Sequence, residues 1–362
     1  MSSFIVIGGG ILGASTAYHL AKQNVRVTLI DRQDLGQASA AAAGIICPWI
    51  SQRRNKKWYA LVRNGAKYYK QLVKELEDLG ETSTGYKQVG AIALQNDTKK
   101  LKKMLDRAKE KREEAPEVGE LKVLSPDETR SLFPLISEDY SSLYVEGAAR
   151  VDGRAMRDAL VRAAEKLGAE IIDGNAQFSD GVVFVNGKQL VADKIILTAG
   201  AWGNEIPSKL GVNMKVSFQK AQIMHFHVEN EETGDWPVVL PPTNQYLLAF
   251  ENGKIVAGST YEEVVAYDHH VTEEGKRLLV ENATGIARTL EKAQIQEVRV
   301  GFRPYTPEFL PVIGNLPGFE YIFFANGLGA SGLTAGPFVG AELARLALGH
   351  ETELDLSLYA PI

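Results

Sequence analysis

The amino-terminal stretch constrains the fold most, because a strand, a glycine-rich turn, a helix and a second strand follow one another there. Residues 4–7 are an apolar run typical of a buried parallel strand, and residues 8–13 carry glycines in the spacing GxGxxG. Residues 14–22 favour a helix, and residues 25–30 form a second apolar run that ends at Asp31. This order predicts a βαβ unit that binds a dinucleotide at the carboxyl end of a parallel sheet.

Each glycine of this turn has a separate physical role. Gly8 permits the tight turn, Gly10 lets a pyrophosphate approach the backbone, and Gly13 lets the helix pack closely on the sheet. The N–H groups at the helix start then face the pyrophosphate, and Asp31 can accept hydrogen bonds from a ribose diol. A signal peptide or a membrane helix fits the glycines and polar residues of this stretch poorly. An unliganded turn is the other alternative, and the choice between NAD(P) and FAD stays open at this point.

Length, charge and cysteine content limit the remaining possibilities. The chain has 362 residues, more than the roughly 250–300 that a single core serves, so two domains are expected. The net charge of −5 gives no electrostatic reason to expect nucleic acid or an anionic membrane as a partner. The single cysteine, Cys47, excludes an internal disulfide and a cysteine-rich metal site, and no metal is expected. Because no cleavable signal precedes the first strand, we expect a cytoplasmic protein without a transmembrane segment.

Small residues recur in further segments that we expect near the same ligand. Residues 38–48 are rich in alanine, which leaves the backbone bare where it passes a flat ligand, although a helix start under the first strand is the alternative. Residues 194–202 are a buried strand that ends in Thr198, Ala199 and Gly200, at the edge of the sheet where ligands bind. A nucleotide-binding turn followed late in the chain by such a strand end is typical of flavin-binding folds.

Residues 216–295 lack the alternation of strand and helix seen at the start of the chain. They contain apolar strands near residues 216–227, 245–250 and 254–260, followed by a helix over 273–290, which predicts an antiparallel sheet in a separate domain. We therefore expect an α/β fold with a Rossmann-like doubly wound FAD-binding domain and an α+β substrate domain with an antiparallel sheet. The FAD-binding domain is expected at residues 1–80, 146–215 and 296–362, and the substrate domain at residues 81–145 and 216–295.

Other segments carry structural rather than chemical signals. A helix is expected over residues 53–79. A charged, solvated helix is expected over residues 99–114, with a membrane-surface role as the alternative. Residues 125–128 have the spacing of a helix capping box, and residues 169–191 predict a β-meander.

Taken together, these segments resemble the FAD-dependent amine and amino acid oxidoreductases, a family that includes glycine oxidase, sarcosine oxidase and D-amino acid dehydrogenase. The run Ala-Ala-Ala-Gly that ends at Gly44 looks most like glycine oxidase. The resemblance implies a two-domain flavoprotein in which an antiparallel sheet covers the flavin. The matching segments keep the family's order along the whole chain and are residues 8–13 with Asp31, 38–44, 198–202, 303–314 and 327–337.

The same resemblance implies FAD as the cofactor. No cysteine lies near Arg303, where the covalent sarcosine oxidases attach their flavin, so a non-covalent FAD is expected. The loop 327–332, which leads into the last helix, is expected to direct N–H groups and a positive helix end at the flavin N1–C2=O edge. The residues expected to bind FAD are Gly8, Gly10, Ile11, Leu12, Gly13, Asp31, Arg32, Ser39, Ala42, Ala43, Gly44, Ile46, Ala176, Thr198, Ala199, Gly200, Trp202, Arg303, Asn326, Gly327, Leu328, Gly329, Ala330, Ser331, Gly332, Leu333 and Thr334.

Two side chains are expected to hold the substrate. Arg303 is the expected clamp for a substrate carboxylate, because guanidinium pairs with carboxylate bidentately, and the family places a substrate arginine in this motif. A structural ion pair with Glu308 is the alternative for Arg303. Tyr246 matches a family position whose hydroxyl faces the substrate carboxylate, although a tyrosine on a strand often only packs. His225 and His227 share one strand face, and we expect both to be surface or hydrogen-bonded residues.

The sequence departs from the family pattern at positions that bear on substrate and acceptor. Leu328 stands where the glycine-rich loop often carries a histidine. The lysine that activates oxygen in sarcosine oxidases is matched by Val256, with Lys254 displaced. These departures weaken an assignment as a sarcosine oxidase and leave the electron acceptor open.

The expected function is oxidation of glycine or a small D- or N-alkyl amino acid to an imino acid by hydride transfer to flavin N5, followed by hydrolysis to the 2-oxo acid. O2 is the first expected acceptor, and a dehydrogenase that passes electrons to a quinone or another carrier is the nearest alternative. An NAD(P)-dependent dehydrogenase, with Arg32 as a phosphate contact, and a flavoprotein used only for binding or regulation are less favoured. The expected partners are the small amino acid and the electron acceptor. Whether the protein forms a homo-oligomer stays open.

Overall fold

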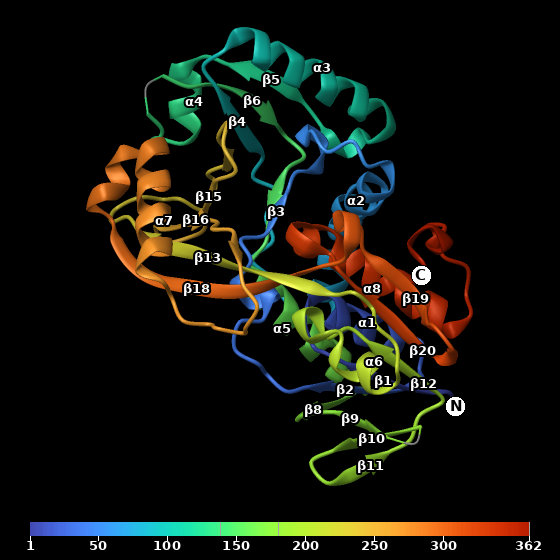
Figure 1. The fold of residues 1–362 in the computed structure, drawn as a ribbon. Coiled ribbons are helices and arrows are strands. Elements are labelled where there is room, and N and C mark those ends of the chain that lie inside the picture. Colours follow the sequence, from blue (N-terminus) through green and yellow to red (C-terminus); the bar gives the residue numbers. More distant parts are fainter. Residues whose placement is uncertain (138, 180, 362) are drawn as a thin grey trace.

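A computed structural model describes residues 1–137, 139–179 and 181–361 of the protein. It contains a six-stranded sheet that is mostly parallel and a nine-stranded sheet that is mostly antiparallel, with helices packed against both. Figure 1 shows the two sheets in different parts of the molecule, with long strands of the second sheet reaching toward the first. The predicted α/β fold with a Rossmann-like sheet and an antiparallel sheet is confirmed.

The six-stranded sheet is the nucleotide-binding type of sheet predicted from the first residues of the chain. Its strands, in spatial order, are β19 (Val312–Leu316), β20 (Phe319–Asn326), β12 (Lys194–Leu197), β1 (Ser3–Ile7), β2 (Arg26–Asp31) and β8 (Glu170–Asp173). All neighbours are parallel except β19, which runs antiparallel to β20 at one edge. β1 is buried along its whole length, as expected for a central strand covered on both faces.

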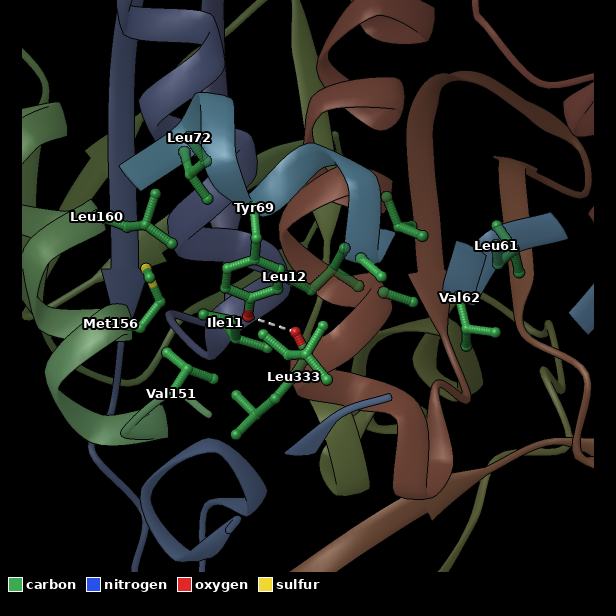
Figure 2. Close-up of a cluster of buried hydrophobic side chains, with 14 of the residues drawn as sticks. Ile11, Leu12, Leu61, Val62, Tyr69, Leu72, Val151, Met156, Leu160 and Leu333 are labelled. Carbon is green, nitrogen blue, oxygen red and sulfur yellow. Dashed lines mark hydrogen bonds between the residues drawn. The ribbon is translucent and has the colours of Figure 1, made fainter. Parts of the chain in front are cut away.

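Helices cover one face of this sheet. α1 lies between the sheet and helices α5 and α8, so it is buried almost all round, and α2 packs on α8. Figure 2 shows side chains of all four helices in one buried cluster, with Leu12, Tyr69, Leu160 and Leu333 among them. The bounds are α1 (Ile11–Ala21), α2 (Lys56–Asp78), α5 (Gly153–Lys166) and α8 (Gly332–Leu348).

A small antiparallel sheet covers the opposite face. Its strands are β9 (Gln177–Ser179), β10 (Val182–Val185) and β11 (Lys188–Leu190). Phe178 and Val183 from this sheet share a buried cluster with Ile5 and Ile30 from β1 and β2. The predicted β-meander is therefore confirmed for β9 to β11. The earlier part of the predicted segment differs, because β8 joins the parallel sheet beside β2.

The nine-stranded sheet has the order β17-β13-β16-β15-β14-β4-β6-β5, with β18 paired along β13. Adjacent strands of this sheet run antiparallel, except that β4 and β14 are parallel to each other. The strands predicted near residues 216–227, 245–250 and 254–260 are confirmed as members of one antiparallel sheet. Its strands are β4 (Ala91–Gln95), β5 (Leu121–Leu124), β6 (Ser141–Val145), β13 (Ser217–His227), β14 (Val238–Leu240), β15 (Tyr246–Ala249), β16 (Lys254–Gly258), β17 (Glu262–Glu263) and β18 (Gln294–Tyr305).

Shorter elements complete this half of the molecule. In Figure 1 helices α3 and α4 lie at the top beside β4, β5 and β6, and α7 lies at the outer side of β13. The predicted capping box at the start of α4 is confirmed, with Ser125 Oγ and the Glu128 side chain exchanging hydrogen bonds with each other's backbone N–H. The remaining elements are α3 (Thr98–Glu114), α4 (Pro126–Leu132), α6 (Glu205–Lys209), α7 (Glu273–Ile286), β3 (Ile45–Ile46) and β7 (Ala149–Arg150).

The predicted domain boundaries stay a prediction. β18 begins near the predicted boundary at residue 296 and pairs along β13 in the nine-stranded sheet, while its far end bridges to Gln37 and Leu328 beside the parallel sheet. No helix among the described residues is long and apolar enough to cross a membrane.

Candidate functional site

A cavity lies between the carboxyl ends of the parallel strands and the nine-stranded sheet. Its lining runs from Asp31, at the end of β2, to Arg303 and Tyr246 on strands of the second sheet. The carboxyl ends of β1, β2, β12 and β20 and the loops that follow them supply the wall on the side of the parallel sheet. This is the edge where ligands bind to open parallel sheets.

The turn between β1 and α1 forms one part of this wall. Gly8 has a φ of +105°, and a Cβ there would lie 2.7 Å from the backbone carbonyl carbon of Thr198. A Cβ at Gly13 would overlap the carbonyl oxygen of Gly8. At Gly10 a Cβ would meet only Ser39 Oγ, at 3.4 Å, and this residue lines the cavity. Gly8 and Gly13 are thus needed for close packing, whereas Gly10 leaves space for a ligand.

Helix α1 starts at this turn with its positive end at the cavity. Its N-cap residue, Gly10, supplies no side-chain cap, and its first turn contains no acidic residue. The Ile11 N–H donates to Ser39 Oγ (2.8 Å), and both residues line the cavity. Because no acidic side chain neutralises this end of the helix, its positive dipole end suits a phosphate group.

Asp31 closes the end of the cavity beside this turn. Its carboxylate accepts hydrogen bonds from the backbone N–H groups of Gly9 and Gln33 and from Gln37 Nε2, the last at 2.8 Å. These contacts fix the carboxylate in the lining and leave it acceptor capacity for a ribose hydroxyl.

Arg32 bears on the choice between FAD and NADP. Its guanidinium pairs with both carboxylate oxygens of Glu205 (2.7 and 2.8 Å), and its Nε pairs with Asp34 (2.5 Å). A 2′-phosphate placed here would meet these two carboxylates instead of free donors. The geometry therefore argues against Arg32 as a phosphate contact of an NADP enzyme.

The loop between β20 and α8 faces the cavity from the carboxyl-terminal part of the chain. Gly327 has a φ of +81°, and a Cβ there would overlap Thr306 Oγ1, so the loop passes close to the end of β18. Asn326 Nδ2 donates to Gly200 O (2.9 Å), which joins this loop to the end of β12. The N-cap residue of α8, Ser331, makes no side-chain cap, so the N-terminus of this long helix adds a positive potential at the cavity.

Arg303 has an unpaired nitrogen at the cavity, and this indicates the charge of the ligand. Its Nη2 donates to Ser259 Oγ (3.3 Å), while its Nη1 is buried and has no hydrogen-bond partner among the described residues. The predicted alternative, an ion pair with Glu308, does not occur among them. A buried guanidinium N–H without a partner is costly, so this geometry fits an anionic ligand in the cavity.

Two tyrosines lie beside Arg303. Burial raises the pKa of Tyr246 to about 12, although a hydrogen bond with Ser259 and the charge of Arg303 act in the opposite direction. Its hydroxyl therefore stays protonated and can donate. The ring of Tyr261 covers the guanidinium of Arg303, with 4.5 Å from Cζ to the ring centroid, and 55% of Tyr261 is exposed. Tyr261 thus marks the mouth through which the cavity meets solvent.

The structure brings nearly all of the predicted site residues to this cavity. The lining contains Gly8, Gly10, Ile11, Leu12, Asp31, Arg32, Ser39, Ala42, Ala43, Gly44, Ala176, Thr198, Ala199, Gly200, Trp202, Tyr246, Arg303, Asn326, Gly327, Leu328, Gly329, Ala330, Gly332, Leu333 and Thr334.

The other predicted residues lie beside the cavity. Gly13 lies beneath Gly8, Ile46 is a buried core residue, and Ser331 Oγ accepts a hydrogen bond from Trp58 Nε1 (2.9 Å). That any of these residues contacts FAD stays a prediction.

Sequence reasoning missed Ser259 and Tyr261. Both follow β16 directly, in the run Gly258-Ser259-Thr260-Tyr261. Ser259 lies at the polar end of the strand predicted over residues 254–260 and Tyr261 directly after it, which was the available signal, but their closeness to Arg303 depends on the pairing of β13 with both β16 and β18.

Other reactive side chains lie outside this lining. Lys254 pairs with Asp152 (3.4 Å), and burial raises the pKa of the Cys47 thiol to about 12. His225 is buried with Nε2 unpartnered in the described part of the chain, and burial lowers its pKa to about 4. The expectation of a surface or hydrogen-bonded residue is therefore wrong for His225, because residues of other segments, including Lys254, Arg299 and Asp152, lie near its ring and none of them hydrogen-bonds Nε2.

Comparison with protein families and curated proteins gives consistent matches. The family model described as "FAD dependent oxidoreductase" (DAO) matches residues 3–346. The chain is 55% identical to the "Uncharacterized oxidoreductase YurR" of Bacillus subtilis (strain 168), over 100% of this chain and 99% of that protein. It is 27% identical to a glycine oxidase of Pseudomonas aeruginosa PAO1, over 99% of this chain and 98% of that protein.

Comparison with solved structures gives a similar result. The crystal structure of iminodiacetate oxidase (IdaA) from Chelativorans sp. BNC1 matches with a TM-score of 0.95 and 39% sequence identity. The match covers 99% of this chain and 98% of that one.

Proposed function

Because this chain belongs to the family of FAD-dependent oxidoreductases, we propose that it oxidises glycine or a small D- or N-alkyl amino acid to an imino acid. Water then hydrolyses the imino acid to a 2-oxo acid and releases ammonia or the N-alkyl amine. With O2 as the acceptor, the two electrons and two protons that the amine loses when it becomes an imine reduce O2 to hydrogen peroxide. Iminodiacetate, named for the similar solved structure, is an N-carboxymethyl amino acid and falls in this class.

The single observation that carries the proposal is the unpartnered Nη1 of Arg303. A substrate carboxylate at this position would pair with a buried cation and satisfy the free N–H. Ser259 holds the other side of the guanidinium, and Tyr246 lies next to it with a protonated hydroxyl. These groups are suited to bind the carboxylate of an amino acid and to fix its α-carbon.

The amine is then bound without a charged partner. The acidic residues of the described lining are Asp31, Asp34 and Glu205, at the far end of the cavity around Arg32. No carboxylate in that lining lies beside Arg303 to stabilise an ammonium. The substrate amine is therefore held neutral, which is the form from which a hydride can leave.

The lining fits FAD at both ends. Gly10 and the start of α1 would take the pyrophosphate, Asp31 the ribose, and the start of α8 the electron-rich edge of the flavin. FAD bound in this way supplies the hydride acceptor, which the side chains of the chain cannot provide. Since the described lining contains neither histidine nor cysteine, we propose that FAD is held non-covalently.

O2 is the proposed electron acceptor, and a quinone or protein carrier is the second candidate. The second candidate is favoured by one observation: the described lining contains no lysine that could activate O2. Lys254 is paired with Asp152 instead. The positive groups near the substrate end are then Arg303 and the N-terminus of α8.

Anaerobic reduction of the purified protein tests this proposal. We expect a yellow protein whose flavin absorbance bleaches on addition of glycine, sarcosine, iminodiacetate or D-alanine, and FAD that is released on denaturation. Readmission of air should restore the colour with one peroxide per turnover if O2 is the acceptor, whereas a carrier-dependent enzyme would stay bleached until a quinone is added. A yellow protein that none of these amines bleaches would refute the proposed substrate class.

A further inference from the structure

We propose that Tyr261 selects secondary amino acids whose N-substituent ends in a carboxylate, by donating a hydrogen bond to that carboxylate at the cavity mouth. This inference rests on the proposed function and specifies the substrate class further. The substrates in question are N-(carboxyalkyl)glycines, with one carboxylate at Arg303 and the second near the surface.

The charges of the cavity leave no cation for a second carboxylate. Arg303 and Arg32 are the cations of the described lining, and Arg32 is already paired with Glu205 and Asp34 at the opposite end. Once one carboxylate occupies Arg303, a second carboxylate finds no cation inside the cavity. Burying an unpaired carboxylate is strongly unfavourable, so the second carboxylate must stay where water can reach it.

Tyr261 lies beside Arg303 at the exposed side of the cavity. It lines the same cavity as Arg303, its ring lies on the guanidinium, and more than half of the residue is exposed. Its hydroxyl has no hydrogen-bond partner among the described residues, in contrast with Tyr267, whose hydroxyl donates to Ala201 O (3.0 Å). A free phenolic donor at the mouth is placed to bind a hydrated carboxylate.

Hydrogen bonds hold the backbone on both sides of Tyr261. The Thr260 N–H donates to Gln222 O (3.1 Å), and the Glu262 carboxylate accepts from Gln222 Nε2 (2.7 Å) and Thr260 Oγ1 (2.8 Å). The residues on both sides of Tyr261 are therefore fixed to β13. Tyr267 holds the following loop by stacking on Trp202 and Phe218. A fixed backbone gives the hydroxyl a defined position, which selectivity requires.

The contribution of the hydroxyl is tested with Tyr261→Phe, which keeps the ring on Arg303. The measurement is the ratio of kcat/KM for iminodiacetate to kcat/KM for sarcosine, two substrates that differ by one carboxylate on the N-substituent. A hydrogen bond to a charged group is worth enough for a fall in this ratio of about tenfold. The matched control is Tyr321→Phe, the same change at an exposed tyrosine outside the cavity, which should leave the ratio unchanged.

A binding experiment tests the same hydroxyl without turnover. Methoxyacetate and diglycolate are the ether counterparts of sarcosine and iminodiacetate, and neither can be oxidised as an amine. Their dissociation constants for the FAD-loaded protein are measured from the change in flavin absorbance. In Tyr261→Phe the dissociation constant of diglycolate should rise about tenfold relative to that of methoxyacetate.

The outcomes separate this inference from the proposed function. If no amine reduces the flavin of the wild-type protein, the proposed function is wrong, and the ratio of the two ether dissociation constants still tests Tyr261. If the amines do reduce the flavin but Tyr261→Phe changes both members of each pair equally, the role given to Tyr261 is wrong. FAD content and the melting temperature of each variant establish that the fold is retained.

Discussion

At the scale of single residues, the guanidinium of Arg303 has three different surroundings. One face is covered by Tyr261, one nitrogen donates to Ser259, and Nη1 is buried without a partner in the described structure. The planar group is thus oriented before any ligand arrives, so little side-chain entropy is lost when a carboxylate binds.

Removal of this guanidinium should weaken substrate capture strongly. For Arg303→Ala we expect kcat/KM for the natural amino acid to fall by a factor equivalent to about 3–5 kcal/mol, because a desolvated carboxylate would lose its buried partner. The loss should appear mainly in KM. Arg303→Lys should recover part of it, since the ammonium keeps the charge but not the fork of donors. Steady-state kinetics measure both variants, and an unchanged KM in Arg303→Ala would show that the carboxylate binds elsewhere.

The ionisation of Tyr246 gives a prediction for the pH profile. Because burial raises its pKa to about 12, the hydroxyl stays protonated below that pH and keeps its ability to donate. We expect kcat/KM to rise with pH as the substrate ammonium loses its proton, without a falling limb from Tyr246 up to about pH 11. Flavin reduction rates over this range check the profile. A falling limb near pH 10 that is absent in Tyr246→Phe would contradict this assignment.

The residues near Arg303 show where sequence reasoning is sufficient and where it ends. Arg303 and Tyr246 were found because family motifs surround them. Ser259 and Tyr261 carry no such motif, and they reach Arg303 only because β13 pairs with β16 on one side and β18 on the other. Pairing between strands that are distant in sequence cannot be derived from residue spacing.

At the scale of elements, the contact between α2 and α8 compensates for a proline. Pro337 lies inside α8 and lacks the N–H that would bond to the carbonyl of Leu333 four residues earlier. The hydroxyl of Tyr69, on α2, donates to that carbonyl at 2.5 Å, as the dashed line in Figure 2 shows. The start of α8 is therefore stabilised by the neighbouring helix, close to the cavity.

Removal of the Tyr69 hydroxyl should destabilise this interface. Tyr69→Phe leaves a buried carbonyl without a donor, and we expect the free energy of unfolding to fall by about 1–3 kcal/mol. Tyr59, also on α2, is the matched control, because its hydroxyl is buried without a partner among the described residues. Tyr59→Phe should be neutral or stabilising. Urea unfolding of the FAD-loaded proteins measures both variants, and equal effects would show that the Tyr69 hydrogen bond is not the cause.

The turn before α1 separates the needs of the fold from those of the ligand. A Cβ at Gly13 would overlap the backbone of Gly8, whereas a Cβ at Gly10 has room in the protein and faces the cavity. We expect Gly13→Ala to lower the melting temperature of the FAD-free protein, and Gly10→Ala to leave it unchanged but to weaken FAD binding at least tenfold. Thermal unfolding and FAD titration distinguish the two. Normal FAD affinity in Gly10→Ala would place the pyrophosphate elsewhere.

Elements that depend on short sequence patterns could be predicted, whereas elements placed by distant strand pairing could not. The βαβ unit, the capping box of α4 and the hairpins β9–β10–β11 depend on short sequence patterns and were found. The role of β8 was missed, because its four residues directly precede the meander and carry no pattern that separates them from it. Glu170–Asp173 (β8) joins the parallel sheet through its pairing with β2, which no local pattern encodes.

At the scale of the whole molecule, the cavity lining joins the two sheets, so ligand binding should stabilise their association. Free FAD at about 100 times its dissociation constant adds about 2.7 kcal/mol to the free energy of unfolding, which corresponds to a rise of several degrees in melting temperature. We expect the melting temperature of FAD-stripped protein to rise steadily with added FAD. ADP, which can contact only the Asp31 end of the cavity, should give a smaller rise, and riboflavin alone a smaller one still. If ADP stabilised the protein as much as FAD does, the flavin end would contribute no contacts, and the cavity between Arg303 and α8 would have to hold a different group.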